Sequence, residues 1–365
     1  MLISKTQVKH RLRNIQQRIL PVTVGVIGGY HGGNLGDMAL GASVIYALQE
    51  KKISSGLQTI YNISKWPQSK FAIVGGGAVG YIDSLTKVAH RYKGNFEKVA
   101  LLGVDFNEKN YSDECIDLIR NAAYVSGRSQ EQAERLTLIS GRTDIKYHPD
   151  IAFSLYRDFC LKNREKRTQK TGKKLMVNVV PLYGKMENGN IVPSEQYRSE
   201  RPELYASFEK MHASYKKLVR DIVIKAASEG FEVETISFTP QDGEYARLIL
   251  EGLAEVRHLD YQSDPYKMIK HMSGASMVLA TRYHATIFAL KLGIPLFPVA
   301  YAVKNELLLQ ELGVNRAAFL STGDLANGLD LMTEPVTVDP EKIGNYEMTS
   351  QAAINESIAA LKVLG

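Results

Sequence analysis

The sequence predicts an α/β protein made of two open, parallel-sheet (Rossmann-like) domains that face each other across a cleft. Its 365 residues suggest two domains, at about 150 residues for each. Short apolar runs that end in glycine or polar turns alternate with helix-length amphipathic stretches. This alternation is typical of a parallel sheet covered by helices. A basic interval without apolar periodicity, residues 162–174, separates two such series.

The first predicted domain covers residues 1–165. Its predicted strands are four apolar runs, each followed by a glycine-rich or polar turn: 23–27, 71–74, 99–104 and 124–125. The carboxyl ends of parallel strands lie at one edge of a sheet, and ligands of open α/β domains bind beyond that edge. Residues that follow these runs are therefore the candidates for a functional site.

The second predicted domain covers residues 172–335 and repeats the pattern. Its predicted strands are 175–180, 231–236, 277–280 and 296–299, with helices that include 207–229 and 245–253. A helical tail, 336–365, is predicted because residues 351–364 are rich in alanine. We expect this tail to pack back across the junction of the domains.

Composition excludes several classes of protein. With 44% hydrophobic and 23% charged residues, the chain is typical of globular proteins rather than disordered ones. Cys115 and Cys160 are too few for a disulfide framework or a zinc site, so a reducing, cytoplasmic location without bound metal is expected. The most apolar stretch, 277–303, contains three basic residues, and no run of the length required to cross a membrane is found.

The net charge of +6 is concentrated in two segments. The first 36 residues hold five basic residues and no acidic one, and residues 162–174 hold seven basic residues against Glu165. Such segments on an otherwise acidic chain predict contact with an anionic partner, such as the inner membrane face or a diphosphate-linked substrate. A solvated surface with a flexible linker is the alternative. Nucleic acid is not expected, because aromatic residues are not interleaved with the basic ones.

A glycine-rich loop, residues 28–37, follows the first predicted strand and leads into a helix expected to begin near Met38. Many glycines allow a ligand to approach the backbone, and a helix N-terminus presents free amides to an anion. Asn34 and Asp37 lie at the end of this loop. In the alternative interpretation, the glycines only form a tight turn and Asp37 caps the helix.

A second glycine-rich segment, 75–80, follows the second predicted strand and matches the pattern G-x-G-x-x-G of dinucleotide-binding proteins. That pattern normally follows the first strand of its domain, whereas here an equally glycine-rich loop precedes it. We therefore expect no nicotinamide or flavin cofactor. Gly76 and Gly77 are instead predicted to offer backbone amides to a substrate.

Cationic side chains follow three further strands. Arg128 comes after the strand at 124–125, where a guanidinium suits bidentate recognition of a carboxylate or phosphate, although a solvated surface arginine is the alternative. Arg282 and His284 follow the strand at 277–280 and combine a fixed cation with a titratable group; for His284 the alternative is a structural histidine. Lys304 and Asp242 follow neighbouring strands and are expected at the same edge.

In this order the motifs resemble the polysaccharide pyruvyl transferase family over residues 23–313. The motifs that carry the resemblance are Gly33-Asn34-Leu35-Gly36-Asp37, Gly75-Gly76-Gly77, Ser126-Gly127-Arg128, Pro149-Asp150, Arg282-Tyr283-His284 and Tyr301-Ala302-Val303-Lys304. One departure is that the family's mid-chain loop usually carries an acidic residue after the arginine, where this chain has Ser129.

The resemblance implies a GT-B-like fold and the transfer of pyruvate from phosphoenolpyruvate to two hydroxyls of one sugar, which forms a cyclic ketal. The acceptor would be a glycan or its lipid-linked precursor, and no further cofactor is implied. On this basis we predict that His284 is the general acid and Asp37 the base. The donor is predicted to contact Arg128, Arg282, Lys304, Asn34, Gly76 and Gly77, and the acceptor Asp242.

Two other functions are consistent with the predicted architecture. One is a glycosyltransferase that uses a nucleotide sugar, since fold alone does not assign a reaction. The other is a non-catalytic, anion-binding protein at the membrane, which would explain the basic segments but not the Arg-x-His motif. The long polar segment 182–205 carries Tyr183, Tyr197 and Tyr205 and is expected either to stack on acceptor sugars or to act as a lid.

Overall fold

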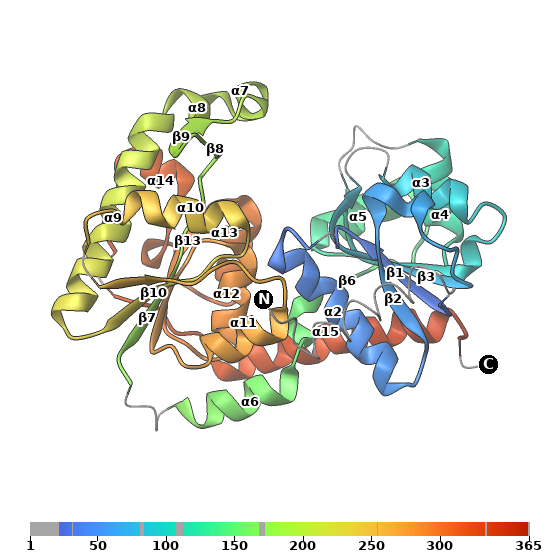
Figure 1. The fold of residues 1–365 in the computed structure, drawn as a ribbon. Coiled ribbons are helices and arrows are strands. Elements are labelled where there is room, and N and C mark those ends of the chain that lie inside the picture. The colour runs from blue at the N-terminus through green and yellow to red at the C-terminus, as the bar shows by residue number, and fades with distance from the viewer. Residues whose placement is uncertain are drawn as a thin grey trace, which may run out of the picture. The chain divides into compact units, whose positions relative to one another are not determined.

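The computed structural model describes residues 22–30, 32–80, 84–106, 112–167, 172–253, 255–332 and 334–363. It divides into two compact units (Figure 1). The first comprises the chain up to Gly32, Asp37–Leu155 and Tyr346–Gly365, and the second comprises Gly33–Gly36 and Tyr156–Asn345. Each unit contains one parallel six-stranded sheet, which confirms the predicted pair of parallel-sheet α/β domains.

The sheet of the first unit has the strand order β2-β1-β3-β4-β5-β6. Its strands are β1 (Val24–Gly28), β2 (Ser55–Thr59), β3 (Phe71–Gly80), β4 (Val99–Phe106), β5 (Tyr124–Gly127) and β6 (Lys146–Tyr147). Its helices are α2 (Leu35–Glu50), α3 (Ser84–Arg91), α4 (Asp113–Asn121) and α5 (Gln130–Ser140), with short 3-10 helices η1 (Ile60–Lys65), η2 (Phe96–Lys98) and η4 (Ile151–Ser154).

The sheet of the second unit has the order β11-β10-β7-β12-β13-β14. Its strands are β7 (Lys174–Asn178), β10 (Glu232–Thr235), β11 (Val256–His258), β12 (Met277–Ala280), β13 (Leu296–Ala300) and β14 (Leu320–Ser321). Its helices are α6 (Arg157–Glu165), α9 (Phe208–Ser228), α10 (Pro240–Ile249), α11 (Pro265–Met272), α12 (Tyr283–Lys291), α13 (Val303–Glu311) and α14 (Thr322–Ala326), with the 3-10 turn η6 (Arg316–Ala318).

An insertion between β7 and α9 holds an antiparallel hairpin, β8 (Gly184–Glu187) and β9 (Asn190–Pro193), followed by α7 (Gln196–Glu200) and α8 (Pro202–Ala206). The hairpin turns at Asn188 and Gly189, which have φ values of +50° and +79°. Asn-Gly is a favoured pair where two consecutive residues need positive φ. The long polar segment 182–205 therefore contains a hairpin and two short helices.

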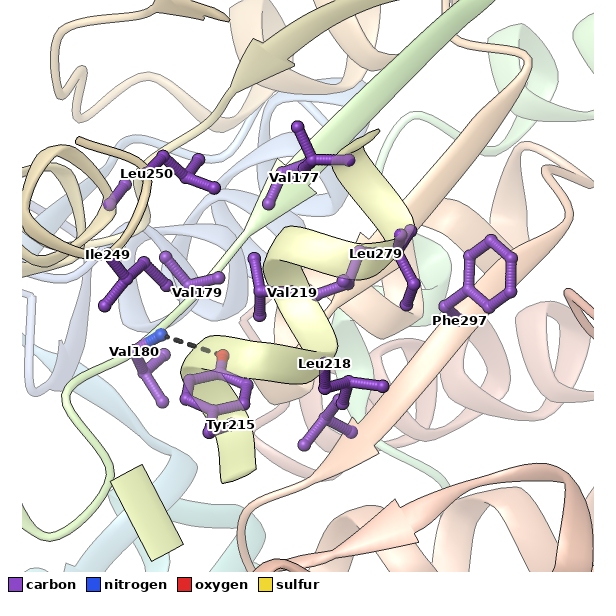
Figure 2. Close-up of a cluster of buried hydrophobic side chains, with 14 of the residues drawn as sticks. Val177, Val179, Val180, Tyr215, Leu218, Val219, Ile249, Leu250, Leu279 and Phe297 are labelled. Carbon is purple, nitrogen blue, oxygen red and sulfur yellow. Dashed lines mark hydrogen bonds between the residues drawn. The ribbon is translucent and has the colours of Figure 1, made fainter. Parts of the chain in front are cut away.

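Helix α9 packs against the sheet in the core of the second unit (Figure 2). Met211, Tyr215, Leu218 and Ile222 recur at helical spacing and are buried against the sheet, as an amphipathic helix requires. Val177 and Leu279 of the two central strands lie in the same cluster. The Tyr215 hydroxyl accepts a hydrogen bond from the Val180 amide at 3.3 Å, so this ring also fixes the chain just after β7.

Several predicted boundaries differ from the observed ones. The glycines at 75–80, predicted to form a loop, extend β3, and a Cβ on Gly75 would lie 1.9 Å from the Leu102 carbonyl oxygen of β4. β2, β6, β11 and β14 were not predicted, because they are short and lack a continuous apolar run. Helix α10 begins at Pro240, before the predicted start at Tyr245, because Thr239 and Asp242 form a capping box there.

The division into units also differs from the predicted domain limits. The second unit begins at Tyr156, so α6 belongs to it, and the Arg164 side chain donates to the Lys291 carbonyl at the end of α12. Helix α15 (Pro340–Ala360) passes into the first unit at Tyr346, where Ser350 donates to the Asp150 carbonyl at 3.1 Å.

The described ends of the basic segment, residues 162–167 and 172–174, are hydrogen-bonded within the second unit. Arg167 donates to the carbonyls of Ala275 and Ser276 at 2.5 and 3.0 Å, and Lys173 donates to that of Glu229 at 2.8 Å. These bonds hold the two side chains against the second unit while both keep their positive charge. The N-terminal basic residues lie outside the described residues, and membrane contact stays a prediction. No helix in the described ranges combines the length and apolar character that a membrane span needs.

Candidate functional site

Asn178 organises the carboxyl edge of the second sheet. It ends the central strand β7 and is fully buried. Its side-chain oxygen accepts a hydrogen bond from the Arg282 amide at 2.8 Å, and its side-chain nitrogen donates to the Ile236 carbonyl at 3.2 Å. One side chain thus ties together the chain segments that leave three neighbouring strands, β10, β7 and β12.

Arg282 is held by Asp242 at this edge. Its Nη2 donates to Asp242 Oδ1 at 2.6 Å, and its Nε lies 3.2 Å from each carboxylate oxygen. A further bond joins Nη2 to the Thr239 hydroxyl at 3.2 Å. The Asp242 side chain is fully buried, whereas that of Arg282 is 23% exposed. The pair therefore presents the guanidinium, and not the carboxylate, to a ligand.

Asp242 is fixed by its own helix as well. Its carboxylate accepts hydrogen bonds from the amides of Phe238 and Thr239, both at 2.9 Å, at the start of α10. These bonds hold the carboxylate in the position from which it orients Arg282. The contact of Asp242 with the acceptor stays a prediction.

The carboxylate also keeps Arg282 charged. Burial disfavours the charged guanidinium, but the adjacent negative charge of Asp242 and its hydrogen bonds raise the pKa of Arg282 above its ordinary value. A permanent cation therefore stands at the carboxyl edge, where an anionic substrate would bind.

His284 lies in the first turn of α12, two residues after Arg282, and is 8% exposed. Its ring packs against Gly36 of the glycine-rich loop, where a Cβ would lie 2.1 Å from Nδ1. The preceding residue, Leu35, donates its amide to the Phe238 carbonyl at 2.8 Å. The end of the first glycine-rich loop is thus part of the second unit and forms one wall beside His284.

Lys304 and Tyr301 complete this edge. The Lys304 ammonium lies 5.1 Å from the centre of the Tyr283 ring and 6.0 Å from that of Tyr301. Within the described part of the chain, the recorded neighbours of Lys304 are aromatic rather than acidic. Tyr183, from the insertion, donates a hydrogen bond from its hydroxyl to the Tyr301 carbonyl at 2.8 Å. Its ring packs edge-on against that of Tyr197, with 4.9 Å between the ring centres.

Two residues of this edge were not selected from the sequence as site residues. Asn178 is the one polar residue in the apolar run 175–180, and a polar residue at the end of a buried strand is the signal that could have found it. Tyr301 was quoted as part of the Y-x-x-K motif without a role. The role of Asn178 depends on Arg282, 104 residues further along the chain, which a local pattern does not show.

The glycine-rich elements of the first unit form a separate cluster. The buried Tyr30 donates its hydroxyl to the Gly75 carbonyl, and burial together with the charge of Asp37 raises the pKa of this phenol. Gly76 has a φ of +71°, a conformation that favours glycine, and a Cβ there would lie 2.6 Å from Leu40. A side chain at Gly76 would collide with Leu40, so glycine at this position allows β3 and α2 to pack closely together.

Asp37 and Asn34 lie at the start of α2. A Cβ on Gly29 would lie 3.2 Å from the Asp37 carboxylate. The pKa of Tyr61 is raised mainly by burial, and the negative charge of Asp37 raises it further. Asn34 accepts the Gly36 amide at 2.9 Å, which satisfies one donor of the helix N-terminus.

Arg128 forms an ion pair with Asp105 in the first unit. Asp105 comes directly after Val104 of β4, and Arg128 comes directly after Gly127 of β5. Val104 and Gly127 are aligned in the sheet, which places the two charged side chains side by side. The Arg128 side chain is 12% exposed. Arg128 and Arg282 are therefore both carboxylate-paired cations at the carboxyl edges of their own sheets.

We expect Gly36→Ala to reduce the rate of any reaction in which His284 takes part about tenfold or more, because the new methyl group would displace the His284 ring from its position. Gly344→Ala in α15 is the matched control, since a Cβ there meets nothing within 4 Å. Steady-state kinetics and thermal unfolding of both variants test this. An active Gly36→Ala enzyme would show that the wall beside His284 is not needed.

Two units, each with a parallel sheet, define a protein of the two-domain α/β class, with cationic side chains at the carboxyl edges of both sheets. The family model for polysaccharide pyruvyl transferase matches residues 34–302, and the chain belongs to this family. A comparison with curated proteins found no match.

Solved structures similar to the chain have low identity to it. A UDP-GlcNAc 2-epimerase from Neisseria meningitidis shares 11% identity over 93% of this chain and 98% of its own, with a TM-score of 0.47. A putative UDP-N-acetylglucosamine 2-epimerase from Listeria monocytogenes shares 13% over 94% and 96%, with a TM-score of 0.45. MurG from Acinetobacter baumannii shares 13% over 94% and 95%, with a TM-score of 0.39. The fold assignment rests on the chain's own strand order.

Proposed function

We propose that the protein transfers pyruvate from phosphoenolpyruvate to two hydroxyls of one sugar in a bacterial polysaccharide or its lipid-linked precursor, which forms a pyruvate ketal. The carrying observation is the cluster of Arg282, His284 and Lys304 at one sheet edge of a chain that belongs to the pyruvyl transferase family. Phosphoenolpyruvate carries a carboxylate and a phosphate, which need cations. Its methylene carbon needs a proton donor during addition at C2.

In this proposal Arg282 and Lys304 bind the anionic groups of the donor. Arg282 offers a fixed, oriented guanidinium because Asp242 holds it, while Lys304 supplies a point charge beside two aromatic rings. His284 protonates the methylene carbon, and the donor's own negative charge favours the imidazolium that a helix N-terminus would otherwise disfavour. Arg128, Gly76, Gly77 and Asn34 as donor contacts, and Asp37 as base, stay predictions.

The test is the release of inorganic phosphate from phosphoenolpyruvate in the presence of lipid-linked or nitrophenyl glycosides. We expect release only when donor and acceptor are both present, with a product whose mass corresponds to a pyruvate ketal. The Arg282→Ala enzyme is the control and should release none. Nucleotide release from a UDP-sugar, without phosphate release from phosphoenolpyruvate, would instead favour a glycosyltransferase. Ligand binding without turnover of any donor would favour a binding protein.

A further inference from the structure

The phenol of Tyr301 faces two cations at the sheet edge. Tyr301 directly follows β13, which pairs with β12, the strand that leads to Arg282. The Arg282 guanidinium carbon lies 6.0 Å from the centre of the Tyr301 ring, and the Lys304 ammonium also lies 6.0 Å from it. Two positive charges this close to the ring favour the phenolate form of Tyr301.

We propose that Tyr301 is a catalytic residue, which accepts the proton of an acceptor hydroxyl as that hydroxyl attacks the donor. The inference rests on the proposed function, because it assigns a base to that reaction. The geometric basis is that the centre of the Tyr301 ring lies 6.0 Å from each of the two cations proposed to bind the donor. A base there would meet the acceptor hydroxyl beside the reacting carbon.

The surrounding charges make Tyr301 more acidic than an ordinary tyrosine. Burial opposes ionisation, but the positive charges of Lys304 on α13 and Arg282 before α12 outweigh it and lower the pKa of Tyr301. Asp242 on α10 acts in the opposite direction with a smaller effect. Tyr183, which faces Tyr301 from the insertion, has a pKa that burial raises, so it is neutral when Tyr301 ionises.

The proposed steps balance in atoms and protons. In the first, the acceptor O–H bond breaks as its oxygen bonds to C2 of phosphoenolpyruvate. The proton passes to the Tyr301 phenolate, while C3 takes a proton from His284. In the second, the other hydroxyl bonds to C2 as the C2–phosphate oxygen bond breaks. His284 then regains its proton from that hydroxyl, and Tyr301 returns its proton to the leaving phosphate.

Asp37 is the competing base. It belongs to the first unit, where it lies beside Gly29 and Tyr61. The two candidates predict different pH dependence. A phenol makes turnover rise with pH until Tyr301 is ionised, which occurs below the ordinary tyrosine pKa of about 10, whereas a carboxylate, with an ordinary pKa of about 4, is ionised well below neutrality. The alkaline part of the pH profile therefore separates them.

The first experiment is an ultraviolet pH titration of the full-length protein, which detects phenolate formation and needs no substrate. We expect one tyrosine to ionise at a lower pH than an ordinary tyrosine, and this signal to be absent in Tyr301→Phe. Tyr92→Phe is the matched control: it removes a buried, hydrogen-bonded phenol whose pKa burial raises, and should leave the signal in place. Lys304→Met should move the signal to higher pH.

The second experiment compares turnover with pH. Tyr301→Phe should lower kcat about 10²-fold at neutral pH, leave KM for phosphoenolpyruvate nearly unchanged, and abolish the rise of kcat with pH. A Tyr301→Phe enzyme with wild-type kcat and pH profile would overturn the inference, as would an unchanged phenolate titration. If the titration is as expected but no acceptor supports phosphate release, the proposed function is wrong, while the conclusion that Tyr301 is unusually acidic remains valid.

Discussion

His284→Ala should lower kcat for phosphate release by about 10²- to 10⁴-fold, the usual effect of removing a general acid. KM for phosphoenolpyruvate should stay within about threefold of the wild-type value, because Arg282 and Lys304, which we propose to bind the donor's anionic groups, are unchanged. His284→Gln keeps most of the side-chain volume at this buried position and should be as inactive as the alanine variant. Steady-state kinetics with varied donor concentration measures both constants.

Rescue by free imidazole distinguishes a lost proton donor from a damaged fold. His284→Ala leaves a space at the site of the ring, so added imidazole should restore part of the turnover, while His284→Gln should not respond. Thermal unfolding of both variants checks that the first turn of α12 is intact. Near-normal turnover in either variant would leave His284 as a structural residue.

Asp242→Ala should be the most destabilising change at the site. It removes the partner of Arg282 and two amide acceptors at the start of α10. Breaking a buried ion pair costs about 3–5 kcal/mol, and we expect about 3 kcal/mol in the free energy of unfolding because Arg282 is partly exposed. KM for phosphoenolpyruvate should also rise about tenfold or more, since the guanidinium loses its fixed orientation.

Asp324→Ala provides a matched control. Asp324 also closes a capping box, at α14, and also pairs with an arginine, Arg316, at 2.6 Å. Its loss should cost about 1 kcal/mol, in line with other caps, without changing KM for the donor. Chemical denaturation and donor kinetics of the two variants make the comparison. If Asp242→Ala raises KM no more than Asp324→Ala does, Asp242 serves only the fold.

The strands and the family could be recognised from the sequence because their signals are local. The strand Met277–Ala280 was predicted with its observed bounds, since a short apolar run between polar turns has few other structures available. The resemblance depended on the order of short motifs, and the family match over residues 34–302 confirms it. The amphipathic pattern of residues 207–229 predicted helix α9 (Phe208–Ser228) to within one residue at each end.

What only the tertiary structure decided is which of these residues act on one another. The apolar pattern shows that Asp242 and Arg282 each follow a strand, but their pairing depends on β7 lying between β10 and β12 in the sheet. Likewise, the sequence shows Gly36 and His284 in separate motifs, and the contact between them arises because Leu35 bonds to Phe238. Hydrophobic periodicity shows which face of each segment is buried. The order of the strands and the pairing of charged side chains depend on packing across the whole sheet, between residues too far apart in the sequence for a local pattern to relate them.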